Sequence, residues 1–239
     1  MKQIKWILIK IYKKFFCVKW PVEALIPQEF IVPDRMFFYG LTRMFVDSIL
    51  MESAPGTYET ILQFLKENYQ GKNVSILDYG CGQHQSKYLN LLYPGNVLSA
   101  DIIDFDLPNF IRINPKNYRI ELGDASKEVV IASEVIEHVY SPFTLLEELI
   151  RISSKYVVIS TPNPASIKSR WQFLLRWFHF WFAPENWDYH ITPVFYWQIE
   201  KFLKEKNLVY IRYANQSFFS LKGNDVWNAE SFVYIITKE

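Results

Sequence analysis

The sequence contains little cysteine. Only Cys17 and Cys81 occur in 239 residues, one among basic and aromatic residues and the other between two glycines. Two distant thiols in such different settings exclude a disulfide framework. With only four histidines in the chain, they do not form a structural zinc site either. A reducing, cytoplasmic compartment is therefore expected.

An excess of either charge is also missing. Lysine and arginine number 26, aspartate and glutamate 25, and the formal net charge is +1. Because no strong positive field results, nucleic acid is not an expected partner. Long apolar runs are absent from the N-terminus too, because Lys5, Lys10, Lys13 and Lys14 interrupt it. This segment is too charged to span a bilayer and lacks the cleavage site of a signal peptide.

Residues 1–20 nevertheless have a helical apolar stripe, with most of the lysines off it. The stripe consists of Ile4, Ile7, Leu8, Ile11, Phe15 and Val18. One interpretation is a helix that packs on the protein's own core. The other is an amphipathic helix on an anionic membrane surface, which would make the protein a peripheral membrane protein. The sequence leaves both open.

Aromatic residues are abundant, at 18% of the chain. Residues 1–56 combine aromatics with four prolines, which predicts a helical N-terminal extension of short helices. Residues 57–239 are expected to form the main domain, with an aromatic insertion at 165–193. Within it, residues 171–182 have more aromatics than one helix face needs. They are interpreted as a substrate lid, a second membrane contact or a core-capping helix pair.

Strands and helices alternate through the main domain, which predicts an α/β fold with a doubly wound, mostly parallel sheet. The last two strands have no helix between them, so they are expected to be antiparallel neighbours. The expected strands are Val74–Leu77, Val97–Asp101, Tyr118–Leu122, Val129–Ala132, Tyr156–Ser160, Leu208–Tyr213 and Ser231–Thr237.

A glycine turn follows the first of these strands, in the sequence Asp78-Tyr-Gly80-Cys-Gly82-Gln83. Glycine permits a sharp turn and a close approach of a ligand to the backbone. Asp101 ends the next strand, where it is placed for the hydroxyls of a ribose. Gly123-Asp124-Ala125 follows the expected third strand and is suited to an adenine edge.

Three acids converging on one crevice favour a cationic nucleoside over a pyrophosphate. A dinucleotide site would also have a third glycine and a helix N-terminus free for phosphate. Gln83 stands there instead. A nicotinamide-dependent oxidoreductase on the same kind of sheet is therefore the less favoured interpretation, and so is a non-catalytic binding protein that keeps the fold.

From Val74 onward the sequence resembles the class I S-adenosylmethionine-dependent methyltransferases, most strongly the branch of ubiquinone and menaquinone biosynthesis enzymes. The resemblance is carried by Asp78-x-Gly80-x-Gly82, by Asp101, by Gly123-Asp-Ala and by the stretch Ala132–Val139. It implies a Rossmann-like seven-stranded sheet with a reversed last strand, and S-adenosylmethionine as the cofactor. The cofactor-binding residues it implies are Asp78, Gly80, Cys81, Gly82, Asp101, Ile102, Asp124, Ala125 and Ser133.

Methyl transfer needs an aligned nucleophile and a group that takes its proton. Glu134, Glu137 and His138 follow the fourth strand at i, i+3 and i+4, which one helical turn would bring together. His138 is the first candidate for a general base, with Glu134 beside it. His190, in a stretch that resembles the family's histidine-containing segment, is the second. The Glu-x-x-Glu-His group could hold a divalent cation, but one segment is thin support and no metal site is predicted.

Together these features predict a methyltransferase that acts on a small-molecule acceptor, with oxygen as the expected nucleophile. A lipid-like, quinone-like or sugar acceptor fits the aromatic insertion.

Overall fold

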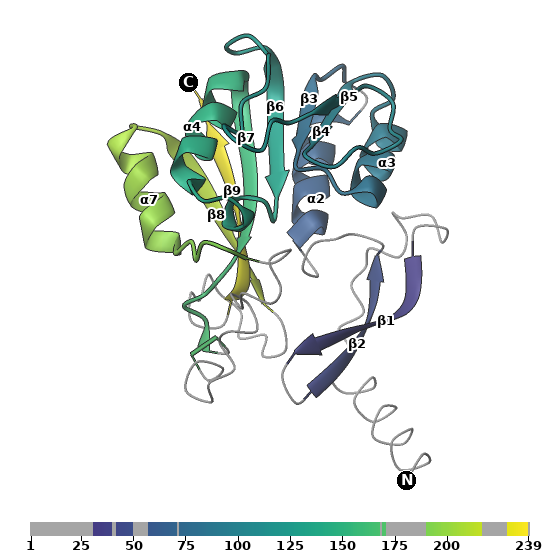
Figure 1. The fold of residues 1–239 in the computed structure, drawn as a ribbon, viewed down its shortest axis with the longest axis vertical. Coiled ribbons are helices and arrows are strands. Elements are labelled where there is room, and N and C mark those ends of the chain that lie inside the picture. Colours follow the sequence, from purple (N-terminus) through teal and green to yellow (C-terminus); the bar gives the residue numbers. More distant parts are fainter. Residues whose placement is uncertain are drawn as a thin grey trace. The chain divides into compact units, whose positions relative to one another are not determined.

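The computed structural model describes residues 31–39, 42–49, 57–70, 72–167, 169–170, 190–216 and 229–238 (Figure 1). The chain divides into two compact units, residues 1–50 and residues 51–239. The two segments with predicted membrane contact, residues 1–20 and 171–182, lie outside the described residues. No described helix is both long and apolar enough to cross a membrane.

The first unit contains an antiparallel pair of strands, β1 (Ile31–Tyr39) and β2 (Thr42–Ile49). Within these residues the structure differs from the helical extension that the prolines predict. Val32 and Arg35 flank an irregularity in the pairing, at the place where Pro33 interrupts β1. Proline cannot donate a hydrogen bond to a neighbouring strand, and here it interrupts a strand where the sequence suggested that it would separate helices.

The second unit is built on a seven-stranded sheet in the order β5-β4-β3-β6-β7-β9-β8. The first five strands in this order are parallel, and β9 runs antiparallel to both of its neighbours. The predicted Rossmann-like fold and the antiparallel closing pair are thus confirmed. The strands are β3 (Ile76–Tyr79), β4 (Val97–Asp101), β5 (Phe110–Arg112), β6 (Lys127–Ser133), β7 (Ser153–Pro162), β8 (Val209–Gln216) and β9 (Ala229–Thr237).

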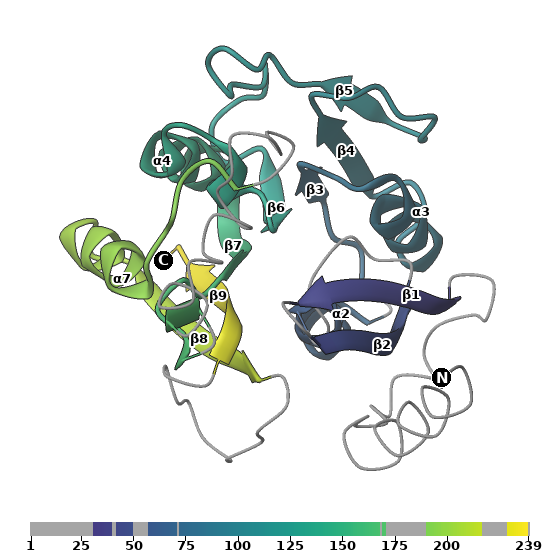
Figure 2. The ribbon, with the colours of Figure 1, turned by 60° about the horizontal axis from the view of Figure 1, so that its bottom comes forward.

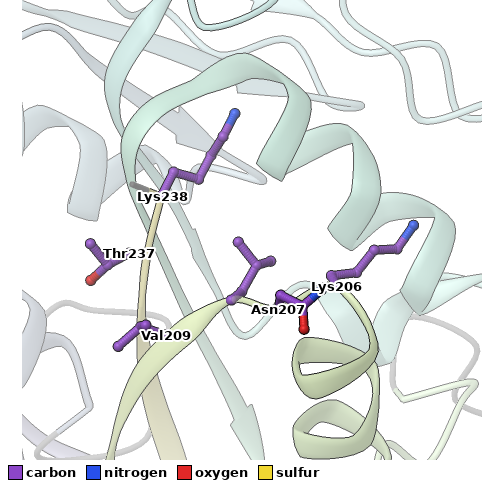
Figure 3. Close-up of a pocket in the computed structure, with 6 residues that line it drawn as sticks. Lys206, Asn207, Val209, Thr237 and Lys238 are labelled. Carbon is purple, nitrogen blue, oxygen red and sulfur yellow. The ribbon is translucent and has the colours of Figure 1, made fainter.

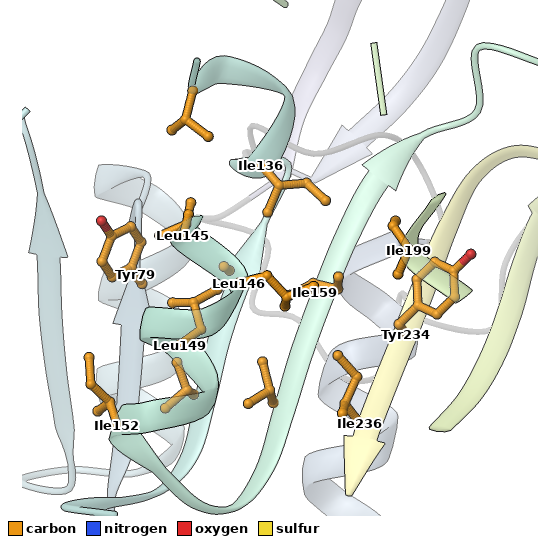
Figure 4. Close-up of a cluster of buried hydrophobic side chains, with 14 of the residues drawn as sticks. Tyr79, Ile136, Leu145, Leu146, Leu149, Ile152, Ile159, Ile199, Tyr234 and Ile236 are labelled. Carbon is orange, nitrogen blue, oxygen red and sulfur yellow. The ribbon is translucent and has the colours of Figure 1, made fainter. Parts of the chain in front are cut away.

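Helices cover both faces of this sheet, with α4 (Pro142–Ile152) and α7 (Tyr196–Glu205) on one side (Figure 2). Leu145, Leu149 and Ile199 of these helices share one buried cluster with strand residues such as Leu77 and Ile159 (Figure 4). The helices α2 (Thr57–Tyr69) and α3 (Gln83–Leu92) lie on the other side. A short 3-10 helix, η3 (Ile136–His138), follows β6.

The predicted third strand is wrong. Residues 118–122 form no strand, and the strand beside β4 is Phe110–Arg112, paired through Asp101 and Arg112. Tyr118–Leu122 has the longer run of alternating apolar residues, which is why it looked like the better strand. Tyr118 instead has a positive φ of 56°, and Ile120 is buried as part of a connection.

Candidate functional site

The glycine turn after β3 has a geometry that only glycine satisfies at Gly80. Its φ is +68°, and a Cβ there would lie 2.4 Å from Cγ2 of Val135. The amides of Gly80 and Cys81 both donate to the carbonyl of Ala100, at 2.7 and 3.1 Å. These bonds hold the turn against the end of β4. The turn therefore leaves its backbone close to any ligand at this edge.

Helix α3 begins directly after this turn. Gly82 is its N-cap residue and supplies no side-chain cap, and Ser86 donates its amide to the Gly82 carbonyl at 3.0 Å. The first turn of a helix presents amides without intrahelical partners. Gly82 therefore leaves room for a polar ligand group at this end of α3.

Asp78 is the third of the four residues of β3 and is almost fully buried, with 2% of its surface exposed. Burial raises the pKa of the Cys81 thiol, and the negative charges of Asp78 and Asp101 raise it further. Burial also raises the pKa of Tyr58, again with help from Asp78. Both groups stay protonated at neutral pH, so Cys81 is not a thiolate nucleophile. The turn is a region of negative potential.

Asp101 ends β4, the strand next to β3, so it lies at the same edge as the glycine turn. Its Oδ1 accepts the amide of Ile103 at 2.9 Å, which fixes the carboxylate beside the strand end. Ile102 follows with 49% of its surface exposed. Ser133 lies at the carboxyl end of β6, with its Oγ 3.0 Å from that of Ser160. The structure thus brings Asp78, Gly80, Cys81, Gly82, Asp101, Ile102 and Ser133 to one edge of the sheet.

Asp124 and Ala125 are not brought to this edge. They precede β6, which begins at Lys127, and therefore lie at its amino end. The Asp124 side chain is 80% exposed and forms an ion pair with Arg151 at 2.6 Å. The amide of Ala125 donates to the carbonyl of Arg151 at 2.8 Å. Both residues tie the amino end of β6 to the end of α4, away from the glycine turn.

The residues that do follow β5 at the carboxyl edge are Ile113 and Asn114, to which no sequence motif points. The amide of Ile113 donates to the carbonyl of Asp101 at 2.7 Å, and its side chain is buried. Asn114 is exposed beside it, and its Oδ1 accepts the amide of Lys116 at 3.0 Å. The alternation of Ile111, Arg112 and Ile113, with Arg112 exposed and Ile113 buried, was the signal that could have found them.

A second group of polar residues lies after β6. Glu134 has a positive φ of 56°, and its amide donates to the carbonyl and the Oγ of Ser160, at 3.2 and 2.9 Å. Glu137 and His138 are in η3, so the predicted helical turn is a 3-10 turn. It leaves Glu137 buried and His138 exposed. The i, i+3, i+4 spacing therefore does not place all three side chains on one face.

His190 joins this group from a distant part of the chain. Its ring lies edge-to-face with that of His138, with centroids 4.9 Å apart. Its Nε2 is 3.9 Å from Oε1 of Glu137. The two predicted base candidates, His138 and His190, are therefore neighbours.

Burial sets the charge state of this group. It raises the pKa of Glu134 to about 7, although a hydrogen bond from Ser160 opposes the shift. Burial, and then repulsion from Glu134, raises the pKa of Glu137 well above its usual range. Burial, and then the nearby His138, lowers the pKa of His190 to about 3. Burial therefore favours the uncharged form of both partners in the contact between Glu137 and His190.

A surface hollow lies at the opposite edge of the sheet, away from these residues (Figure 3). It is lined by residues around the start of β8 and the end of β9. Its lysines are already engaged: Lys206 pairs with Glu147 at 2.6 Å, and Lys238 donates to the carbonyls of Ile150 and Ser153. This hollow has no connection with the site.

Structures of other proteins share the fold at low sequence identity. An S-adenosylmethionine-dependent methyltransferase from Archaeoglobus fulgidus is 18% identical, with a TM-score of 0.53 over 77% of this chain and 95% of that one. The magnesium protoporphyrin IX methyltransferase from Synechocystis, solved with bound S-adenosylhomocysteine, is 13% identical, with a TM-score of 0.55 over 77% and 82%. An S-adenosylmethionine-dependent methyltransferase from Mesorhizobium loti is 12% identical, with a TM-score of 0.55 over 77% and 99%.

The comparison of sequences gives the family. No curated protein sequence matches the chain. Residues 58–238 match the family described as methionine biosynthesis protein MetW, which spans the whole sheet and every predicted site residue. The match does not single out the ubiquinone and menaquinone branch. The chain belongs to the MetW family.

Proposed function

We propose that this chain is an S-adenosylmethionine-dependent methyltransferase that acts on an oxygen nucleophile of a small-molecule acceptor. The observation that carries the proposal is the edge formed by Asp78, the Gly80 turn and Asp101. It combines a turn that requires glycine, a buried carboxylate and a second carboxylate on the adjacent strand. Methyltransferases with this fold support the same assignment.

These residues fit S-adenosylmethionine. A Cβ at Gly80 would collide with the Val135 side chain, so glycine is required for the sharp turn that joins β3 to α3 beside Asp78. The negative potential that raises the Cys81 pKa suits a ligand with an ammonium and a sulfonium. Asp78 would face the ammonium end, and Asp101 would accept hydrogen bonds from ribose hydroxyls. When bound, the cofactor supplies an activated methyl group.

Adenine would lie beyond Asp101, along Ile102 and the segment after β5. Ile102 offers an exposed apolar surface, and Asn114 offers an amide at the carboxyl end of β5. Asn114 takes the place first given to Asp124, because the carboxyl ends of parallel strands lie at one edge of the sheet.

The acceptor would lie after β6, beside Glu134, His138 and His190. A general base must be able to reach the acceptor and to receive a proton near neutral pH. His138 is exposed, so an acceptor can reach it, and Glu134, with a pKa of about 7, can receive a proton near neutral pH. His190, with a pKa of about 3, is a weak base and is better suited to orienting His138.

The alternative of a nicotinamide-dependent oxidoreductase has less support. Gln83 takes the place of the third glycine, and Asp78 would repel a pyrophosphate. Titration of the protein with S-adenosylmethionine and with NADH separates the two. We expect binding of the first and none of the second, and the reverse would overturn the proposal. Binding of neither would favour a non-catalytic protein.

A further inference from the structure

Three side chains with the chemistry of metal ligands lie together beyond β6. Glu137, His138 and His190 each place one ligand atom so that all three lie within 4.8 Å of one another. Two of them come from η3, and His190 comes from the far side of the aromatic insertion. A set drawn from two segments is not a by-product of helical spacing.

The backbone holds the two segments together. The amides of Ile191 and Thr192 both donate to the carbonyl of Glu137, each at 3.0 Å. The Thr192 hydroxyl donates to the carbonyl of Val139 at 2.7 Å. These three bonds fix the chain beside His190 against η3. A ligand set that is fixed before binding costs less to order when an ion binds.

Glu137 supplies an independent observation. Its side chain is only 2% exposed, and neither carboxylate oxygen has a hydrogen bond of good geometry among the described residues, although the Thr161 hydroxyl and its own amide lie near enough to oppose the rise of its pKa. Buried carboxylate oxygens normally accept hydrogen bonds, so an exception of this kind calls for an explanation such as an ion. One of these oxygens is 3.9 Å from Nε2 of His190, within the cluster.

We propose that Glu137, His138 and His190 bind one divalent transition-metal ion of the zinc type. Two imidazole nitrogens and one carboxylate suit zinc, iron or cobalt, whereas magnesium and calcium prefer oxygen alone. Ligand atoms on a tetrahedral zinc lie about 3.3 Å apart, so shifts of about 1 Å would close the cluster. His138 is exposed, which leaves a path for entry.

Three protein ligands leave a fourth position open. If the proposed function holds, this position faces the acceptor: the ion would polarise the acceptor oxygen, and Glu134 would receive its proton while the ion occupies His138. Polarisation of the acceptor oxygen rests on the proposed function, whereas binding of the ion does not depend on it.

The test uses the full-length chain after treatment with a chelator, titrated with Co²⁺ alone. We expect one equivalent to bind, with visible absorption bands of low-coordinate cobalt. His190→Ala and Glu137→Gln should each weaken binding by about 10-fold or more. Glu147→Gln is the matched control, because Glu147 is an exposed carboxylate on α4 paired with Lys206. His84→Ala, in α3, is the control for loss of a histidine.

A second measurement needs no variant. Zn²⁺ should raise the midpoint of thermal unfolding of the chelator-treated wild-type protein, because an ion that binds only the folded state stabilises it. The site would be overturned if the wild-type protein did not bind one equivalent of Co²⁺. It would also be overturned if His190→Ala and Glu137→Gln both bound Co²⁺ as tightly as the two control variants. Titration of the same samples with S-adenosylmethionine separates the two proposals, because either ligand can bind when the other does not.

Discussion

The carboxyl ends of β3 and β4 and those of β6 and β7 form two neighbouring regions that are built in different ways. In the first, Asp78, Gly80 and Gly82 belong to one continuous strand-turn-helix segment, and Asp101 ends the adjacent strand. In the second, Glu137 and His138 meet His190 only because the chain returns after the aromatic insertion. The comparison teaches that the proposed cofactor turn is a local feature, whereas the proposed acceptor side is assembled from distant segments.

The two regions also treat charge differently. At the glycine turn, burial and then the charges of Asp78 and Asp101 raise the pKa of Cys81. After β6, burial favours the protonated form of Glu137 and the neutral form of His190. The first region therefore favours a cationic ligand, whereas burial in the second favours uncharged side chains.

The largest expected effect comes from adding a side chain at Gly80, where the glycine turn packs against Val135 after β6. Gly80→Ala places a Cβ 2.4 Å from Val135, in a backbone conformation that L-residues rarely adopt. We expect a loss of about 1–3 kcal/mol in the free energy of unfolding and loss of S-adenosylmethionine binding. Thermal unfolding and calorimetry measure these effects. Gly123→Ala, where a Cβ meets nothing within 4 Å, is the control, and equal behaviour of the two variants would contradict the account.

The next effect separates chemistry from cofactor binding. His138→Ala should lower kcat by about 10²- to 10⁴-fold, the usual contribution of a general base. The affinity for S-adenosylmethionine should stay the same, because His138 lies after β6 and not at the glycine turn. A single-turnover assay with an identified acceptor measures the first quantity and calorimetry the second. An unchanged kcat would remove His138 from the role of base.

A smaller effect concerns pH. The folded-state pKa of Glu134 is about 7, above its usual value, so the native state holds a proton that the unfolded state releases. Stability should therefore fall as pH rises between about 4.5 and 7, because fewer protons are bound in the unfolded state. Glu134→Gln should reduce this slope in chemical denaturation measured across that range. A slope that does not change would show that Glu134 is not buried as described.

The smallest effect is expected at Asp124. Its ion pair with Arg151 is 80% exposed on the aspartate side, and exposed pairs contribute about 0–1 kcal/mol. Asp124→Ala should therefore change the unfolding midpoint little and leave cofactor affinity unaltered. A large loss of S-adenosylmethionine affinity would instead support the predicted contact of Asp124 with adenine. It would contradict the place of Asp124 at the amino end of β6.

Much of the fold and one part of the site could be predicted from the sequence. The strand-turn-helix around Gly80 was identifiable because strand, acid and glycines are consecutive, and their geometry is local. The third strand could not be identified, because Tyr118–Leu122 has the same alternation of apolar and polar residues as a true strand. Only the pairing with β4 distinguishes Phe110–Arg112. The approach of His190 to Glu137 could not be identified from the sequence, because hydrogen bonds between distant segments leave no local pattern. The predicted membrane contacts remain predictions.

The central claim is that the carboxylate at the end of β4 holds the ribose of S-adenosylmethionine. The most direct test is the dissociation constant of S-adenosylmethionine for Asp101→Ala, measured by calorimetry beside the wild type. Loss of hydrogen bonds to a charged group predicts binding that is weaker by about 10- to 100-fold, with an unchanged unfolding midpoint. An affinity equal to that of the wild type would contradict the account.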